Sequence, residues 1–478
     1  MKIKRIVTAL MLLAVVFVSV FSFAGCRKQV VMPEFEMPEG GFDTNKKITI
    51  TFYHTMNANL RDVLDFYIGE FQKLYPNVTV KHQQVGSYED VRNQISTEIN
   101  VGDQPNIAYC YPDHVALYNM ASAVQPLDVL INSTLTEKRA DGTTETIGLT
   151  DAQIADFIKG YYDEGKQFGD GKMYMMPFSK STEVLYYNKT FFDQHNLTVP
   201  TTWDEMEAVC EQIKALVPNC TPLGYDSEAN WFITMCEQSG SAYTSSGENH
   251  FKFDNATNRA FVARFREWYQ KGYVTTQELS GGYTSKLFTK NEGEVGKVYM
   301  CIGSSAGATN QAPNKVNGKY AFEVGIATVP QLNPEKPKVI SQGPSLCIFK
   351  KEDPQEVLAS WLFVKYLTTC VEFQAEFSMT SGYVPVIKSV GDNPVYAEFL
   401  ENADGGDYIA ALSAKRCLEQ EAAYYTSPAF YGSAVARDQV GLLMQKCLSA
   451  AWTSGETASQ IKKAFENAVS ECKYQTGS

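Results

Sequence analysis

Five consecutive polar residues, from Ser179 to Glu183, interrupt a strand-like part of the sequence. Apolar runs lie on both sides of them, and Pro177, which has a fixed φ and no amide hydrogen, marks the break. Hydroxyl groups and a carboxylate at such a break are available to a ligand if the chain passes there from one domain to another. Ser181 and Glu183 are therefore candidate ligand-binding residues, although a hairpin with a polar turn would produce the same pattern.

Three further places carry side chains that could bind a ligand with hydroxyl groups and an apolar face. Asp113 follows a predicted strand at 106–111 and could accept paired O–H bonds, or it could be the N-cap of the next helix. Trp231 lies in a polar stretch and could be a stacking platform or a buried anchor. Ser304 and Ser305 begin a predicted helix, whose free N–H groups could receive a hydroxyl or an anion.

Two glycine positions would let the backbone approach a ligand. Gly343 precedes a proline and a serine, and Gly382 precedes Tyr383, but both could be ordinary turns. His54 ends the first predicted strand, at 47–53, and is a further candidate ligand-binding residue.

The elements that would position these residues alternate between strand and helix. Period-2 and period-3.6 patterns predict strands at 47–53, 78–85 and 106–111, with helices at 60–75 and from Ser87. Strands and helices alternating with short links are typical of a parallel α/β unit. Further strands and helices follow residue 200, and the last hundred residues are predicted to be mostly helical.

The amino terminus has the features of an export signal. A basic start is followed by an apolar run at 6–24, and the small residues before Cys26 resemble the bacterial lipobox. This pattern predicts a signal peptide at 1–25, lipidation of Cys26 and a flexible tether at 26–45. A retained, uncleaved anchor is the alternative. Either way, the protein is expected at the cell surface, anchored to the outer face of the cytoplasmic membrane.

Composition and cysteine spacing exclude several other classes. The formal net charge of -12 argues against a nucleic-acid partner. Ten cysteines besides Cys26 permit disulfides, and Cys210 and Cys220 are the closest pair in sequence. The sequence contains neither CxxC nor HxxxH, so no metal site is expected, and no cofactor is expected either.

An ordered set of segments carries a resemblance to one family. The segments include ITITFYH at 48–54, QPNIAYCYPD at 104–113, GKMYMMPFSKSTEVLYYNKTFF at 171–192 and VPTTWDEM at 199–206. With the lipobox, they resemble the extracellular solute-binding proteins (family 1) of carbohydrate ABC importers, which include maltose- and glycerol-phosphate-binding proteins. This resemblance covers essentially the whole mature chain.

The resemblance implies an α/β, two-lobed fold of the periplasmic-binding-protein type (type II), with a ligand cleft between the lobes. Three crossings are expected between the lobes, near 179–182, near 321–324 and near 379–382. Lobe 1 would then comprise 46–178 plus 325–378, and lobe 2 would comprise 182–322 plus 382–478. The resemblance further implies a monomer that captures a saccharide by hinge closure and delivers it to the transmembrane subunits of a permease with a cytoplasmic ATPase.

Similarity is greatest to the glycerol-3-phosphate-binding members, and four residues fall at positions that line their cleft: Tyr88, Ser181, Gly343 and Tyr383. The sequence departs from them at Pro112, where they have a glutamate, and at 429–431, which lacks their phosphate-binding arginine. We therefore expect a neutral di- or oligosaccharide, with Phe430 as a second stacking face, rather than a glycerol phosphate.

Two alternatives come from other functional classes. A secreted glycoside hydrolase would need a pair of carboxylates, for which Asp113 and Glu183 are the candidates, but no surrounding pattern supports them. A sensor partner that presents its ligand to a receptor cannot be distinguished from an importer component by sequence. The expected protein is a binding protein and not an enzyme.

Overall fold

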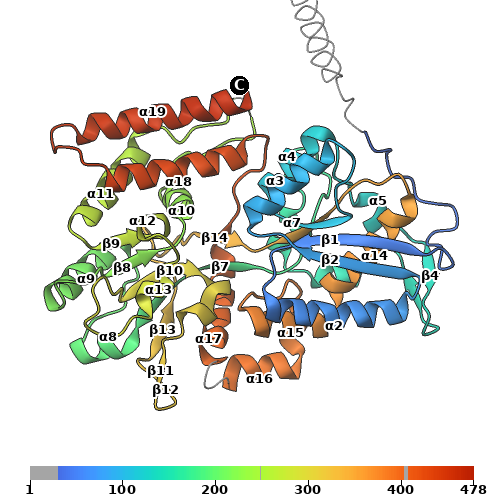
Figure 1. The fold of residues 1–478 in the computed structure, drawn as a ribbon, viewed down its shortest axis with the longest axis horizontal. Coiled ribbons are helices and arrows are strands. Elements are labelled where there is room, and N and C mark those ends of the chain that lie inside the picture. Colours follow the sequence, from blue (N-terminus) through green and yellow to red (C-terminus); the bar gives the residue numbers. More distant parts are fainter. Residues whose placement is uncertain (1–30, 248, 403–406, 478) are drawn as a thin grey trace, which may run out of the picture.

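The computed structural model describes residues 31–247, 249–402 and 407–477 (Figure 1). The predicted signal peptide, Cys26 and the first residues of the predicted tether lie outside these ranges. Within them, no helix is both long and apolar enough to cross a membrane.

The first sheet lies in the amino-terminal half of the fold. Three strands run parallel in the order β2-β1-β3; β15 then pairs antiparallel to β3, and β6, at the edge, pairs antiparallel to β15. Phe52 pairs with Ile107 in this register, and both side chains are buried in the first core. The strands are β1 (Ile48–His54), β2 (Val78–Gln84), β3 (Ile107–Cys110), β6 (Met176–Pro177) and β15 (Ser345–Ile348).

The helices around this sheet follow the amphipathic pattern. In α2 (Ala58–Leu74), the Asn57 side chain accepts the amide of Leu60 at 3.1 Å, and the apolar face at 3.6-residue spacing is buried, which confirms the predicted helix. Ser87 and Asp90 form a capping box at the start of α3 (Tyr88–Ile99). The other elements of this lobe are α4 (Pro112–Tyr118), η1 (Asn119–Ala121), α5 (Asp128–Ile131), β4 (Thr136–Lys138), β5 (Thr144–Thr146), α6 (Asp151–Asp156), α7 (Lys159–Glu164), α14 (Pro354–Thr369), α15 (Val371–Ser381), η3 (Lys388–Asp392) and α16 (Pro394–Asn402).

The second sheet has seven strands, in the order β16-β14-β7-β10-β8-β9, with β13 also paired to β7. Its long central strand β7 is buried along nearly its whole length. The strands are β7 (Ser181–Asn188), β8 (Leu223–Tyr225), β9 (Val274–Thr276), β10 (Met300–Ser304), β13 (Val324–Ala327), β14 (Val339–Gln342) and β16 (Tyr424–Tyr425).

The helices of this second lobe include the red pair α18–α19, which lies along its upper side in Figure 1. Thr202 and Glu205 form a capping box at the start of α9. The remaining elements are α8 (Lys189–His195), α9 (Trp203–Leu216), α10 (Glu228–Ser239), α11 (Ala256–Gln270), α12 (Gln277–Ser280), α13 (Ser285–Phe288), η2 (Ser305–Gln311), β11 (Lys315–Val316), β12 (Lys319–Tyr320), α17 (Asp407–Glu419), η4 (Glu421–Ala423), α18 (Ser433–Ser449) and α19 (Thr457–Thr476).

The strand pairing corrects two of the three predicted crossings. The first crossing, between β6 and β7, lies at 178–180, close to the predicted place. The second does not lie at 321–324, because β13 and β14 both pair with β7; the chain crosses at Gly343 and Pro344, between β14 and β15. Residues 384–400 still pack against the first core, so the third crossing follows α16 rather than residue 382.

The predicted tether is also corrected in its described part. Phe42 is buried in the first core, and Phe35 and Met37 pack against it. Gln355 on α14 donates to the carbonyl of Gly41 at 2.9 Å, and Lys350 forms an ion pair with Glu34. Residues 34–43 are therefore docked on the first lobe, because their apolar side chains have a surface to cover there.

A buried ion pair joins the crossing segments. Lys180, in the first crossing, pairs with Glu164 of α7, and its ammonium also donates to the carbonyl of Gly343 at 3.3 Å and to Ser345 Oγ at 3.2 Å. The backbone of Lys180 exchanges two hydrogen bonds with Val384. One residue therefore ties the first crossing to the second and to the segment after α15.

Candidate ligand-binding site

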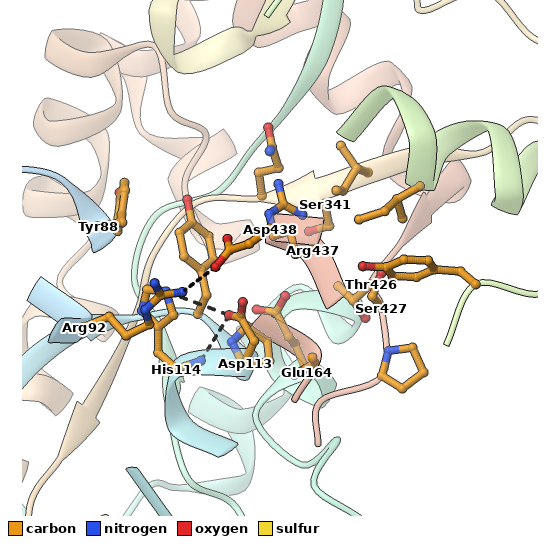
Figure 2. A pocket seen from close by; sticks show the side chains of 18 of the residues that line it. Tyr88, Arg92, Asp113, His114, Glu164, Ser341, Thr426, Ser427, Arg437 and Asp438 are labelled. Carbon is orange, nitrogen blue, oxygen red and sulfur yellow. Dashed lines mark hydrogen bonds and ion pairs between the residues drawn. The ribbon is translucent and has the colours of Figure 1, made fainter. Parts of the chain in front are cut away.

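A cavity of about 250 Å³ lies between the two lobes and is lined by both (Figure 2). The first lobe contributes the amino-terminal ends of α3 and α4 and the end of α7. The second lobe contributes β14, the loop at 426–428 and the first two turns of α18. The site therefore exists only because elements distant in sequence meet across the crossings.

The first-lobe wall combines tyrosines with a charged group. Tyr88 begins α3, and Arg92 follows one turn later on the same side of the helix. The ring of Tyr88 lies 4.8 Å from that of Tyr111, and its hydroxyl lies 3.3 Å from the hydroxyl of Tyr383. This arrangement presents aromatic surface and hydroxyl groups together, which suits a polyol ring.

Asp113 and His114 stand at the start of α4, directly after strand β3. Asp113 lines the cavity, and its Oδ1 accepts the amide of the adjacent His114 at 3.0 Å. The alternative role as N-cap is wrong, because Tyr111 is the N-cap of α4 and Asp113 lies within the first turn. The buried ring of His114 also lines the cavity, and its Nδ1 has no hydrogen-bond partner among the described residues. Burial lowers the pKa of His114, and the nearby carboxylate of Asp113 opposes that shift.

The second-lobe wall is built around Arg437 on α18. Its guanidinium donates to Asn230 Oδ1, and the Asn230 amide donates to Glu183 Oε1 at 2.9 Å. Tyr225 donates to the other oxygen of Glu183 at 2.6 Å. Glu183 is thus a buried support behind the wall, and it holds Arg437 through Asn230.

Two polar contacts join the lobes at the rim of the cavity. Arg92 of α3 lies 3.6 Å from the carboxylate of Asp438 on α18, as Figure 2 shows. Thr426 donates to Gln167 at 2.9 Å. Burial raises the pKa of Asp438, and Arg92 opposes that rise. These contacts describe a closed arrangement of the lobes.

Of the residues predicted from sequence, Tyr88 and Asp113 line the cavity, and Tyr383 reaches it through its contact with Tyr88. The glycine at 343 lies in the second crossing with φ +95, where a Cβ would come within 2.7 Å of Lys180 Cα. It therefore serves the close approach of two crossings rather than the cavity wall.

The serine candidates lie inside the second lobe. Ser304 donates to Ser181 Oγ at 3.3 Å, and Ser305 accepts the Thr182 amide at 3.3 Å. Ser181 and Ser305 are buried, and none of the three lines the cavity. Instead of lining the cavity as predicted, these serines join β7 to η2 through hydrogen bonds.

Three aromatic candidates lie elsewhere. Trp231 is fully buried in the second core, with its ring 4.8 Å from that of Tyr225, and so it offers no face to a sugar. Phe430 stacks on His250 at 4.6 Å and lines a separate cavity. His54 is buried at the end of β1, where its Nδ1 accepts the Met56 amide at 3.1 Å; burial lowers its pKa to about 3.

Sequence reasoning missed the charged residues of the closed cavity. Arg92 could have been found from its position one turn after Tyr88, because residues four apart share a helix face. Arg437 and Asp438 gave no such signal, since only the packing of α18 brings them to the cavity.

Metal and disulfide chemistry are not evident in the described residues. They contain no group of three or more His, Cys, Asp or Glu side chains arranged to hold a metal ion. Their ten cysteines, including Cys210 and Cys220, are free thiols, and all except Cys370 are buried.

Comparison with known proteins identifies the family. The sequence matches the profile described as bacterial extracellular solute-binding protein over residues 67–402, which is more than half of the chain. The chain belongs to the bacterial extracellular solute-binding proteins. The sn-glycerol-3-phosphate-binding periplasmic protein UgpB of Escherichia coli K12 is 24% identical over 440 residues, covering 88% of this chain and 91% of that protein.

Solved structures share the fold at low identity. UgpB from Mycobacterium tuberculosis, in complex with glycerophosphocholine, has a TM-score of 0.70 at 18% identity and covers 88% of this chain and 98% of that one. The maltose-bound MalE3 of T. maritima has a TM-score of 0.67 at 15% identity and covers 90% of this chain and 100% of that one. These similarities confirm the predicted two-lobed fold.

The family also confirms the predicted functional class. The chain is an extracellular solute-binding protein, a class of binding proteins rather than enzymes. A hydrolase is not favoured, and Glu183, one of its two required carboxylates, is buried behind the cavity wall.

Trp231→Ala should destabilise the fold by about 3–5 kcal/mol, as expected for truncation of a large buried side chain. Chemical denaturation of the protein without ligand measures this loss. Phe66, which is 58% exposed, is the control, and Phe66→Ala should change the free energy of unfolding by no more than about 0.5 kcal/mol. Normal stability of Trp231→Ala combined with lost ligand affinity would instead support the sugar-stacking role.

Burial raises the pKa of Glu183 to about 7. Between its ordinary pKa and this value, the carboxyl stays protonated in the folded state but loses its proton in the unfolded state. Stability should therefore fall by roughly 2–3 kcal/mol as the pH rises from 5 to 7.5. Denaturation curves at several pH values measure this slope. Glu183→Gln should remove this contribution to the dependence of stability on pH. The control Glu211→Gln, at an exposed glutamate, should leave that dependence unchanged. Equal slopes in wild type and Glu183→Gln would contradict the prediction.

Proposed function

We propose that this protein is a lipid-anchored, monomeric component of its importer and captures a neutral saccharide in the cavity between its lobes. The observation that carries the proposal is the composition of the cavity. Tyrosine rings from one lobe face hydroxyl groups from the other, and contacts between Arg92 and Asp438 close the rim. Closure of such a site would be favoured by a ligand that both lobes contact.

The ion pairs at Arg92 and Glu164 support a neutral ligand. Arg92 is paired with Glu89 at 3.3 Å and with Asp438, and Glu164 is paired with Lys180. Carboxylates and guanidinium groups held in this way can still exchange hydrogen bonds with vicinal hydroxyls. The volume of about 250 Å³ lies near the lower end of the roughly 300–1,000 Å³ usual for ligand pockets, which favours a mono- or disaccharide over longer chains.

A phosphorylated polyol is the second candidate, and Arg437 favours it. The expectation of a neutral ligand rested on the missing arginine at 429–431, but α18 brings a guanidinium into the cavity from a later position. Among the described residues, no carboxylate lies within 4.0 Å of this guanidinium to form an ion pair. UgpB proteins are named for sn-glycerol-3-phosphate or were solved with glycerophosphocholine, which makes phosphate esters the natural comparison.

A thermal-shift panel of mono- and disaccharides, polyols and glycerol phosphates tests the ligand class. A ligand at a thousandfold excess over Kd stabilises the folded state by about 4 kcal/mol, so one class should raise the unfolding midpoint by several degrees. We expect a neutral saccharide to do so, and Asp113→Asn to weaken its effect more than Arg437→Gln does.

Other outcomes separate the alternatives. A shift confined to phosphate esters and lost in Arg437→Gln would establish the second candidate and overturn the first. Chromatography of the same incubations should return the sugar intact, because fragments would indicate a hydrolase. ATP-dependent uptake in cells distinguishes an importer component from a sensor partner.

Cys26→Ser should release the protein from the membrane fraction, because two acyl chains on that cysteine would form the proposed anchor. Fractionation and the mass of the mature protein measure the change. Cys370→Ser, at a partly exposed thiol far along the chain, is the control and should remain membrane-bound. A Cys26→Ser protein that stays in the membrane at its normal mass would contradict lipidation.

A further inference from the structure

Three polar atoms on residues that line the ligand cavity are buried and have no hydrogen-bond partner among the described residues. They are His114 Nδ1, Tyr243 Oη and Ser427 Oγ. A buried polar atom without a partner costs free energy, and most such atoms in folded proteins are paired. The presence of three of them around one cavity indicates that a bound molecule supplies the missing hydrogen bonds.

The first of these atoms belongs to the first lobe. His114 is only 5% exposed, and its ring lies edge-on to that of Tyr111 at 5.5 Å. Its Nε2 is 4.0 Å from Asp113 Oδ1, which is too long for a hydrogen bond. In Figure 2, His114 and Asp113 lie side by side, away from Ser427. The imidazole is therefore held in place by packing, and its hydrogen-bonding capacity remains for a ligand.

The other two atoms belong to the second lobe. Tyr243 follows α10 and is 6% exposed, with its ring edge-on to that of Phe232 at 6.3 Å. Burial raises the pKa of Tyr243 and Arg437 opposes that rise, so the phenol stays protonated and can donate. Ser427 lies in the loop at 426–428, which Thr426 fixes to the first lobe through its bond to Gln167. Two hydroxyl groups thus face the cavity from positions that packing determines.

The chemical group that suits all three atoms is a hydroxyl. A serine or tyrosine hydroxyl can donate and accept, and an imidazole nitrogen does one or the other according to its tautomer. A ligand hydroxyl can adapt to each of them, whereas a phosphate dianion offers acceptors only. A sugar ring also fixes the directions of its hydroxyl groups, so contacts from two lobes can distinguish one configuration from another.

We propose that His114, Tyr243 and Ser427 are specificity-determining residues that bind hydroxyl groups of one saccharide from opposite lobes. This inference rests on the neutral saccharide proposed above. A sugar that lacks one of these hydroxyl groups leaves a buried atom unpaired, which makes closure around it less favourable. A site of this kind discriminates against a missing hydroxyl more strongly than against a small change in apolar volume.

Isothermal titration calorimetry of the purified protein tests the three contacts. The probes are glucose, galactose, mannose, maltose and cellobiose, with glycerol 3-phosphate for comparison. Tyr243→Phe and Ser427→Ala each remove one hydroxyl and should raise the Kd of the tightest-binding sugar about threefold to tenfold. His114→Phe should raise it at least about tenfold. His114→Asn, whose amide can form a hydrogen bond near the position of Nδ1, should bind that sugar more tightly than His114→Phe.

Monodeoxy derivatives of the same sugar separate direct contact from a structural role. At least one derivative should bind the wild type about tenfold more weakly than the parent sugar, and the matching variant should bind both alike, because the two losses are not additive. Tyr396 is the control, since its hydroxyl is also buried and without a partner among the described residues but belongs to the first core and does not line the cavity. Tyr396→Phe should bind and discriminate as the wild type does. Thermal unfolding checks that each variant is folded.

The possible failures are distinguishable. Saccharide binding with the wild-type Kd in the folded variants would overturn the three contacts and leave the proposed function standing. Losses on deoxygenation that are the same in the variants as in the wild type would also overturn the contacts. Binding of glycerol 3-phosphate alone, or of none of the probes, would overturn the neutral-saccharide proposal and this inference with it.

Discussion

The buried pair of Lys180 and Glu164 is the interaction on which the arrangement of the two lobes depends. Lys180 lies in the first crossing and reaches Gly343 and Ser345 in the second, and Glu164 comes from the first lobe. Removing one member of a buried ion pair commonly costs about 3–5 kcal/mol, which approaches the whole free energy of unfolding of a marginally stable domain. The crossings must therefore stay together while the lobes move.

The same pair connects the crossings to the ligand cavity. Glu164 lines that cavity and is held in place by α7 and by its ion pair with Lys180 in the crossing. On the other lobe, Arg437 reaches back through Asn230 to Glu183, which lies on β7 just three residues after Lys180. Both walls of the cavity are thus held by groups at the start of β7, where the chain enters the second lobe. The polar stretch that stands out in the sequence positions the site from behind.

Elements whose stabilising contacts are local could be predicted from the sequence. The helix at 60–75, the helix that begins at Ser87 and the parallel strands depend on periodicity and short-range hydrogen bonds. The second crossing lies some twenty residues after its predicted place, because strand pairing between β7, β13 and β14 is long-range and leaves no trace in periodicity. Residues 34–43 differ from the predicted tether because Phe35 and Phe42 find their partners only in the folded first lobe.

The sequence by itself determined the family, the α/β class and two residues of the cavity wall, Tyr88 and Asp113, each at a helix start directly after a strand or turn. Tertiary structure alone decided the rest of the site. Trp231 and Arg437 illustrate the reason: a tryptophan in a polar stretch can turn inward, and an arginine on a late helix can reach a cavity, according to how α10 and α18 pack. Burial and proximity are properties of packing between distant segments, and residue type and spacing do not specify them.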